Sequence, residues 1–340
     1  MKNLIFNPEG NDSYHARQIW HGNTTNLCNL NNVKYNWATH LYKQMRQNFW
    51  IPQKINLTED VVDYRKLTVQ ERRVFKGIIG YLTFLDSIQT VNLPHLKSPI
   101  TAPEIGICFA EQISQEAMHN ESYQYVIETI IPEPERNEVY EYWRNNKFLY
   151  NRCKGIANLY QQYIDNPTDE NYLVALFADY LLEGIYFYNG FNVFYAFAYR
   201  GLLGSTSDLF KMINRDELSH VRLMQNLLVE AMKIMPYSVE QLLSIASDAV
   251  EREIEWTNHI TNEEILGISC SSTNEYTKYL ANLRLKAIGL PKLYEEKLTN
   301  PYKHLEKFAD KEAEANSKGN FFEAAVTSYQ MSSSIDNWDF

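Results

Sequence analysis

Apolar residues recur every three or four positions over long stretches of this chain, which is the spacing of one face of an α-helix. No stretch of any length alternates apolar and polar residues in the way that a half-buried strand would. The pattern therefore predicts an all-α fold. The expected helices cover about 37–49, 68–94, 101–127, two segments within 134–165, 169–199, 206–235, 238–260 and 274–289.

Short sequence signals mark where three of these helices begin. Thr68-Val-Gln-Glu71 and Thr101-Ala-Pro-Glu104 both have the spacing of a capping box, in which each side chain accepts a hydrogen bond from the other residue's backbone N–H. Ser238-Val-Glu-Gln241 is expected to cap a further helix. The helical pattern that opens at Thr68 is expected to end near Pro94.

The chain divides into three parts by its sequence pattern. Residues 1–35 are rich in asparagine and irregular, and residues 36–300 carry the helical pattern. The apolar pattern thins over residues 301–340, which are expected to end in a mobile tail over 332–340. One helical domain between two less regular ends is therefore expected.

Composition supports long helices and narrows the class of protein. The 13 glycines and 11 prolines make 24 of 340 residues, about 7%, where average usage would give roughly 12%. The formal charge is −10, from 32 Lys+Arg and 42 Asp+Glu, and there is no basic block, so nucleic-acid binding is not expected. The four cysteines are scattered, which excludes a disulfide scaffold.

One apolar segment, residues 173–199, has the length of a membrane span. It carries Asp179 and Glu183 near its middle, and each carboxylate would be costly in lipid. A buried helix explains the segment better. The N-terminus has no apolar stretch long enough for a signal peptide, so a cytoplasmic protein without membrane contact is expected.

Acids and histidines occupy helix stripes that should be purely apolar. Glu116-Ala-Met-His119 and Glu217-Leu-Ser-His220 are two copies of Glu-x-x-His, each inside an expected helix. At a spacing of three, both side chains project from one helix face, so a single metal ion can bind both. One copy alone is more simply an exposed polar pair. Two copies on apolar stripes favour metal binding.

Burying the acids on these stripes requires positive charge nearby, because an unpaired buried carboxylate costs several kcal/mol. Four such acids contribute −4, and a pair of divalent cations would contribute +4. Dinuclear carboxylate sites in helical bundles take one acid from each of two helices and Glu-x-x-His from each of two others. Oxygen-rich ligation with two imidazoles suits iron or manganese better than structural zinc. The predicted ligands, in chain order, are Asp86, Glu116, His119, Glu183, Glu217 and His220.

The chain resembles the small, radical-generating subunit of class I ribonucleotide reductase over about residues 35–340. The resemblance implies a ferritin-like helical bundle with additional helices, a homodimer, and the same six metal ligands. It also implies that Tyr123 matches the tyrosine that is oxidised to a stable radical. Its signatures here are Leu85-Asp86-Ser87-Ile88-Gln89, Glu116-x-x-His119-x-x-x-Tyr123, Glu183 with its following aromatic run, and Arg215-Asp216-Glu217-x-x-His220.

The position of Tyr123 agrees with a radical role. It lies four residues after His119 on the same stripe, so its ring can approach the metal nearest that histidine. Helical spacing places Phe187, Phe191 and Ile213 toward the same interior, where an apolar cage would shield a phenoxyl radical. The alternative for Tyr123 is an ordinary core tyrosine.

Further residues gain roles through the resemblance. Trp50 matches a tryptophan of the long-range radical path, and Asp216 matches the acid that links this indole to His119. Tyr329 matches the tyrosine that passes the radical to the large catalytic subunit, and the C-terminal tail resembles the peptide that docks on that subunit. Gln112 stands where some family members carry a tryptophan.

The implied activity is the reduction of ribonucleotides to deoxyribonucleotides on the large subunit. A pair of iron ions is expected, and manganese is possible with an activating flavoprotein. Two other functions use similar ligands: a di-iron oxygenase or oxidase that attacks an organic substrate directly, and ferritin-type iron storage. The oxygenase has no use for Tyr123, Trp50 and a docking tail together. Storage subunits are usually shorter, and they need neither the aromatic cage nor the long extra helices.

Overall fold

The computed structural model of the protein describes residues 4–262 and 265–308, and these contain helices but no named strand. The predicted all-α fold is confirmed for this part of the chain. None of its helices combines the length and apolar character that crossing a bilayer would take. The helices are α1 (Asn36–Gln47), α2 (Thr58–Lys66), α3 (Val69–Lys97), α4 (Pro103–Ile130), α5 (Glu133–Asn145), α6 (Lys147–Asp165), α7 (Asp169–Leu181), α8 (Tyr188–Tyr199), α9 (Gly204–Ala231), α10 (Val239–Thr261) and α11 (Cys270–Ala287).

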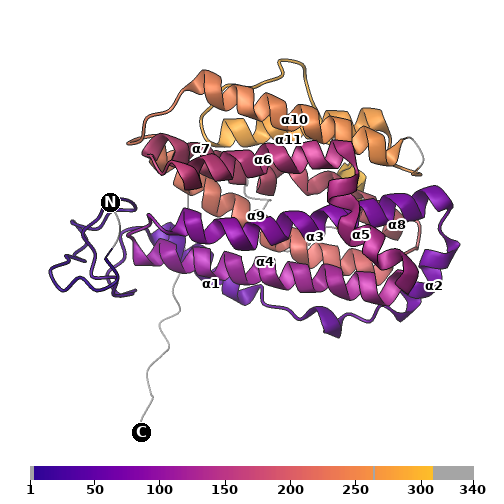
Figure 1. The fold of residues 1–340 in the computed structure, drawn as a ribbon, viewed down its shortest axis with the longest axis horizontal. Helices are drawn as coiled ribbons and strands as arrows, with labels where there is room; N and C mark the ends of the chain where they lie inside the picture. Colours follow the sequence, from indigo (N-terminus) through magenta and orange to yellow (C-terminus); the bar gives the residue numbers. More distant parts are fainter. Residues whose placement is uncertain (1–3, 263–264, 309–340) are drawn as a thin grey trace, which may run out of the picture.

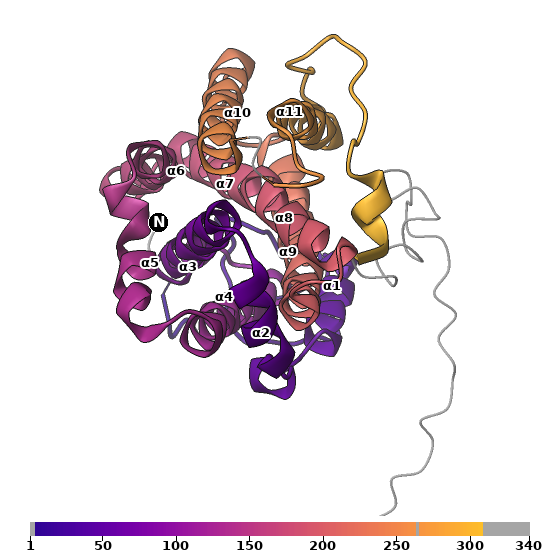
Figure 2. The ribbon, with the colours of Figure 1, turned by 90° about the vertical axis from the view of Figure 1, so that its right-hand side faces the viewer.

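The long helices run side by side, with α3 and α4 in front of α9 in Figure 1. Figure 2 looks along the bundle and shows α3, α4, α9 and the α7–α8 pair around a common centre. Helices α10 and α11 lie outside this group against α6, α7 and α8, and α5 lies beside α3. The bundle centre is therefore enclosed by elements from four separate stretches of sequence.

Two of the three predicted caps are present. Thr68 Oγ1 accepts from the backbone N–H of Glu71 at 3.1 Å, and Glu71 Oε2 accepts from the N–H of Thr68 at 2.9 Å, which is a complete capping box at the start of α3. Ser238 Oγ accepts from the N–H of Gln241 at 3.1 Å at the start of α10. Local sequence therefore determines where these helices begin.

The predicted capping box at Thr101–Glu104 is wrong. Helix α4 begins after Ala102 with no side-chain cap, because the N-terminal segment engages both residues. Thr101 Oγ1 donates to the carbonyl of Gln18 at 2.9 Å, and Glu104 forms a buried ion pair with Arg17 at 3.0 Å. The irregular segment that precedes α1 is thus fastened to the first turn of α4.

The observed helices differ from the predicted ones most clearly at α3, at residues 169–199 and at α2. Helix α3 continues through Pro94 to Lys97, although a proline at this position lacks the N–H for one backbone hydrogen bond of the helix. The expected helix over 169–199 is divided into α7 and α8 by a π-helical turn, Leu182–Tyr186. The short helix α2 was not predicted. Its buried Asp60 caps α9 from outside, because Asp60 Oδ2 accepts from the backbone N–H of Thr206 at 2.5 Å and from the hydroxyl of the same residue at 2.6 Å.

Candidate metal centre

The structure brings all six predicted ligands together at the centre of the bundle. Asp86 comes from α3, Glu183 from the π-helical turn, and a Glu-x-x-His pair from each of α4 and α9. All six side chains are completely buried. Helical spacing determines which face of its helix each residue lies on. Packing of the helices then brings these faces together, so that the six residues form one cluster.

The cluster consists of two ligand groups that share two glutamates. One group is Asp86, His119 and the shared Glu116 and Glu217, and in the other Glu183 and His220 join the same two glutamates. Within each group the ligand atoms lie within 4.8 Å of one another. Two neighbouring metal positions with two common carboxylates fit this arrangement.

The shared glutamates direct one oxygen toward each histidine. His119 Nδ1 lies 3.2 Å from Glu217 Oε1 and 3.5 Å from Glu116 Oε2. His220 Nδ1 lies 2.9 Å from Glu217 Oε2 and 3.0 Å from Glu116 Oε1. Each histidine therefore presents Nδ1 to its own metal position, with one oxygen of each shared carboxylate beside it.

The donor atoms lack other partners, as expected for metal ligands. Among the described residues, both oxygens of Asp86 and of Glu116, Oε2 of Glu183, Oε1 of Glu217 and Nδ1 of His119 are buried without a hydrogen bond. Buried carboxylates in this state are costly unless a cation compensates them. The residues present therefore fit a dinuclear metal site.

The pKa shifts of the clustered side chains also fit a dinuclear metal site. Burial raises the pKa of Asp86 well above its ordinary value, and the charges of Glu116 and Glu217 raise it further. Burial alone would lower the pKa of His119 and of His220, but the surrounding carboxylates outweigh it and raise both. Without metal the cluster thus retains protons, which bound cations would displace.

Glu183 lies in the π-helical turn that interrupts the expected helix. Such turns leave backbone carbonyls without their usual helical partners and are frequent at functional sites. Here Arg284 Nε donates to the carbonyl of Gly184 at 3.1 Å, and Arg152 Nη2 donates to that of Tyr186 at 2.6 Å. Helical spacing gave no sign of this turn, because its carbonyls are satisfied by side chains distant in sequence.

Each of the two ligand histidines has a polar partner on the other helix of the α4–α9 pair. In both cases this partner is the residue directly before the shared glutamate of that helix. His119 Nε2 on α4 lies 3.4 Å from Asp216 Oδ2 on α9. His220 Nε2 on α9 lies 3.0 Å from Gln115 Oε1 on α4. Such partners orient metal-binding imidazoles and select their tautomer. The sequence analysis did not identify Gln115. It could have been found from its position, because it directly precedes Glu116 just as Asp216 directly precedes Glu217.

Tyr123 is buried beside the first ligand group. Its hydroxyl has no hydrogen bond within the described part of the chain, and burial together with the Asp86 charge raises its pKa well above the ordinary value. Its ring lies 5.9 Å from that of Phe210, whose ring is 6.0 Å from Phe191. Phe187 and Ile213 are also buried. Phe210 was not predicted, although it precedes Ile213 by three on the same helix.

Residues 27–301 match the family described as "Ribonucleotide reductase, small chain". This match covers most of the chain. The chain belongs to this family. Small chains of class I ribonucleotide reductases work with a separate large subunit. The enzyme that the two subunits form is an oxidoreductase.

Individual relatives agree with the family match. The ribonucleoside-diphosphate reductase subunit beta of Treponema pallidum is 37% identical, covering 98% of this chain and 96% of that protein. The subunit beta of Halalkalibacterium halodurans is 34% identical, covering 94% of each chain. The relatives support a reductase subunit and give no support to the oxygenase alternative.

A solved structure shows the same architecture. The ribonucleotide reductase R2 subunit from Clostridium botulinum superimposes with a TM-score of 0.86 at 41% identity, covering 91% of this small chain and 98% of that chain. The predicted ferritin-like bundle with additional helices is therefore confirmed.

Trp50 connects the metal centre of the small chain to its surface. Its indole Nε1 donates to Asp216 Oδ2 at 2.8 Å, the same oxygen that faces His119. The half-buried indole lines a surface groove of about 340 Å³ together with Phe49 and Met118, and Phe49 is 70% exposed. The link between Trp50, Asp216 and His119 is thus present. Tyr329 and the tail over 332–340 lie outside the described residues.

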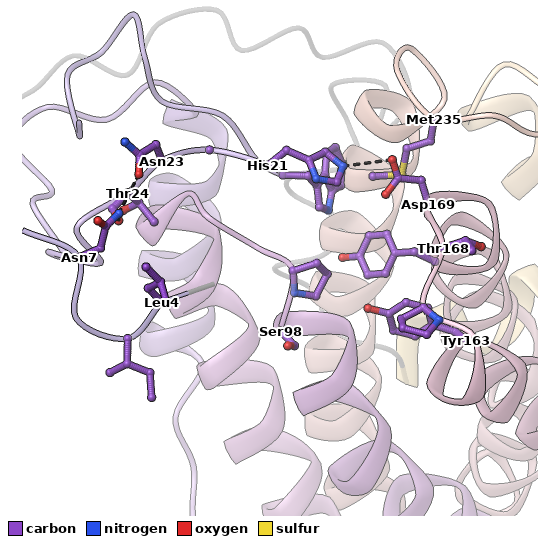
Figure 3. A pocket seen from close by; sticks show the side chains of 16 residues that line it. Leu4, Asn7, His21, Asn23, Thr24, Ser98, Tyr163, Thr168, Asp169 and Met235 are labelled. Atoms are coloured by element: carbon purple, nitrogen blue, oxygen red, sulfur yellow. Dashed lines mark hydrogen bonds and ion pairs between the residues drawn. The ribbon is translucent and has the colours of Figure 1, made fainter. Parts of the chain in front are cut away.

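A separate cavity of about 930 Å³ lies between the N-terminal segment and the first turn of α7. Figure 3 shows His21 pointing toward Asp169 across this region, and their side chains are 3.1 Å apart. Asn7 donates to Asn23 at 2.8 Å within the N-terminal segment. None of the six predicted ligands lines this cavity, so cavity size does not mark the metal centre of this small chain.

Proposed function

We propose that this small chain binds two iron or two manganese ions and generates a radical on Tyr123. The carrying observation is the pair of buried ligand groups that share Glu116 and Glu217, with Tyr123 buried beside Asp86. Iron is the first expectation, and manganese would involve an activating flavoprotein. The working form is a cytoplasmic homodimer. Binding of Mn²⁺ in a ratio of two per chain, measured by EPR of the free ion, tests the metal site directly.

The side chains around Tyr123 suit one-electron oxidation of its phenol. Bound metal ions would supply the oxygen-activating chemistry that amino-acid side chains lack. Tyr123 starts as a neutral phenol, because its raised pKa keeps the proton on the hydroxyl oxygen. Its electron would pass to metal ions that oxygen has oxidised, and its proton to an oxygen atom of the ligand cluster. Phe210 and Phe191 exclude water from the ring, which protects the radical from reduction.

The hydrogen bonds at Asp216 suit transfer of the radical away from the centre. Asp216 Oδ2 accepts from the Trp50 indole and faces His119 Nε2, so one carboxylate joins the metal centre to an oxidisable side chain at the surface groove. We infer that the path continues from Trp50 through Tyr329 in the tail to the large subunit. Asp216 holds the indole N–H in a fixed direction and can take its proton.

Trp50→Phe is expected to lower ribonucleotide reduction roughly hundredfold, equivalent to about 2.7 kcal/mol, while the radical on Tyr123 still forms. A phenyl ring lacks the N–H that Asp216 binds and is harder to oxidise. Turnover with the large subunit and the EPR signal of the small chain are measured together. Trp143→Phe is the matched control, since Trp143 stacks on Phe84 away from the ligands and should keep full turnover. Equal turnover in both variants would contradict the path.

Deleting residues 332–340 is expected to abolish turnover with the large subunit and to leave metal content and radical yield unchanged. The deleted segment holds the acidic, aromatic-ended sequence Ile335-Asp-Asn-Trp-Asp-Phe340, which suits docking into a groove. A synthetic peptide of residues 332–340 should compete with the full-length protein for the large subunit and so inhibit turnover. Unchanged turnover of the deletion variant would remove the docking role.

A further inference from the structure

Two buried amides converge on one oxygen of Glu183. Gln89 Nε2 on α3 donates to Glu183 Oε1 at 2.6 Å, and Gln112 Nε2 on α4 donates to the same oxygen at 2.9 Å. The other oxygen, Oε2, has no hydrogen bond among the described residues and lies 3.7 Å from His220 Nδ1. The carboxylate is thus divided into one oxygen held by the protein and one left for the metal position.

The Gln89 amide is itself fixed by two further buried residues. Its Nε2 also donates to Asp179 Oδ1 at 2.8 Å, and the Tyr160 hydroxyl lies 3.2 Å from Gln89 Oε1 and 3.1 Å from Asp179 Oδ1. Ionised carboxylate oxygens accept but do not donate, so when both acids are ionised the NH₂ end of Gln89 faces Asp179 and Glu183, as the structure has it. The amide therefore cannot reverse without losing hydrogen bonds to both acids.

Among the described residues, no amide holds the equivalent acid of the first ligand group in this way. Both oxygens of Asp86 are buried without a hydrogen bond in the described part of the chain, so either or both can face a metal ion. Glu183 is restricted where Asp86 is free. The two metal positions therefore differ in how tightly the protein fixes their individual carboxylates.

We propose that Gln89, fixed by Asp179 and Tyr160 and assisted by Gln112, positions Glu183 so that only its Oε2 binds the second metal ion. This inference rests on the proposed metal site. The second ion would then receive Glu183 Oε2, His220 Nδ1 and one oxygen from each shared glutamate. An ion that prefers six ligands would keep positions for water or a small oxygen species on this side. Gln89, Asp179 and Tyr160 are positioning residues, and none contacts the reacting atoms.

Binding of Mn²⁺ to metal-free protein tests the proposal in Gln89→Leu. Removing a residue that orients a ligand typically costs 10–100-fold in metal affinity. The affinity of the second position should fall by about this factor, while that of the first should change by less than about threefold. Free Mn²⁺ is measured by EPR during titration, and anomalous diffraction at the manganese edge identifies which position is lost. Asn92→Leu is the matched control, a buried amide on α3 with no side-chain hydrogen bond among the described residues.

A second pair of variants tests the contribution of Asp179 without touching the amides. Asp179→Asn keeps an oxygen that can accept from Gln89 and should bind both ions as the wild type does. Asp179→Leu removes that oxygen and should weaken the second position selectively. Gln112→Leu removes the other donor to Glu183 Oε1 and is measured in the same way if Gln89→Leu does not fold. Thermal unfolding of the metal-free variants establishes which of them fold.

Each result decides between the two proposals. If wild-type protein binds no pair of ions, both the proposed metal site and this inference fail. If the wild type binds two ions and folded Gln89→Leu binds both as tightly, the inference fails and the metal site stands. Equal weakening of both positions also overturns it. In crystals of the Mn²⁺-loaded wild type, a bond from Glu183 Oε1 to the metal would contradict the restriction to Oε2.

Discussion

Tyr123→Phe is expected to bind the same pair of metal ions as the wild type and to give no tyrosyl-radical signal after metal loading and exposure to oxygen. The substitution removes one hydroxyl group, and with it the phenolic proton that must leave with the electron. Phenylalanine fills the same space against Phe210, so the ligand cluster should be undisturbed. Turnover with the large subunit should fall to background.

The structure makes this variant a clean test, because the Tyr123 hydroxyl has no hydrogen bond among the described residues. Asp86 is the polar side chain that the Tyr123 hydroxyl faces, and Asp86 keeps its place in the ligand cluster when the hydroxyl is removed, so the free energy of unfolding should change by only about 1 kcal/mol. EPR and optical spectra measure the radical, and metal analysis measures the ions.

Tyr172→Phe is the matched control for this experiment. Tyr172 is also buried, but its hydroxyl donates to the carbonyl of Leu96 at 2.8 Å rather than facing the ligand cluster. This variant should retain the radical at wild-type yield, even if it loses some stability. A normal radical yield in Tyr123→Phe would refute the assignment of the radical to Tyr123.

The clustering of the six candidate ligands was predictable from sequence for a specific physical reason. Helical periodicity relates residues within one helix over three or four positions, and acids on an apolar stripe conflict with that stripe unless something compensates them. The conflict at Glu116 and Glu217 is visible without knowing how the helices pack. Burial of both residues and their membership of both ligand groups agree with that reasoning.

Features that depend on contacts between helices were not predictable in this way. The π-helical turn at Glu183 relies on Arg284, which is about a hundred residues away in sequence. Gln115 reaches His220 only because α4 and α9 are neighbours. The capping box at Thr101 failed for the same reason, since the N-terminal segment competes for its side chain. Local patterns predict faces and helix starts, and tertiary contacts decide which of them persist.

The buried charge also exceeds what the sequence analysis counted. Besides the four predicted carboxylate ligands, Asp179 and Asp216 are completely buried close to the cluster. Burial raises the pKa of Asp179 to about 7, although hydrogen bonds from Gln89 and Tyr160 oppose the shift. Asp216 contacts the ligand His119 directly. Asp179 is connected to the ligand Glu183 through Gln89, which donates to both acids. Asp179 and Asp216 therefore add negative charge around the ligand cluster and help to hold two of its side chains in place.

Glu217→Ala is expected to lose affinity for both metal ions, whereas Asp86→Ala should lose one and retain the other. Glu217 belongs to both ligand groups and Asp86 to the first alone. Removing a shared carboxylate takes a ligand and a negative charge from each position at once. We expect Mn²⁺ affinity to fall at least about 100-fold at both positions of Glu217→Ala, a cost at the upper end of the range for residues that only orient ligands.

Thermal unfolding with and without Mn²⁺ gives an independent measurement of the same effect. An ion at 100 times its dissociation constant stabilises the folded state by about 2.7 kcal/mol, so the wild type should unfold at a clearly higher temperature with Mn²⁺. Glu217→Ala should show no such shift and Asp86→Ala a reduced one. Without metal, Asp86→Ala should be at least as stable as the wild type, because it removes a buried acid that Glu116 and Glu217 repel. Glu217→Ala should be less stable without metal, because Glu217 pairs with both His119 and His220 and its loss leaves these histidines without that partner.

Glu230→Ala is the matched control, since Glu230 lies on the same helix as Glu217 but pairs with Lys233 at the surface. It should show the full stabilisation by Mn²⁺. Retention of one ion at wild-type affinity in Glu217→Ala would show that Glu217 serves a single metal position, and loss of both ions in Asp86→Ala would show that the two positions cannot fill separately. Either result would contradict the division into two groups joined by shared glutamates, on which the proposed function of this small chain depends.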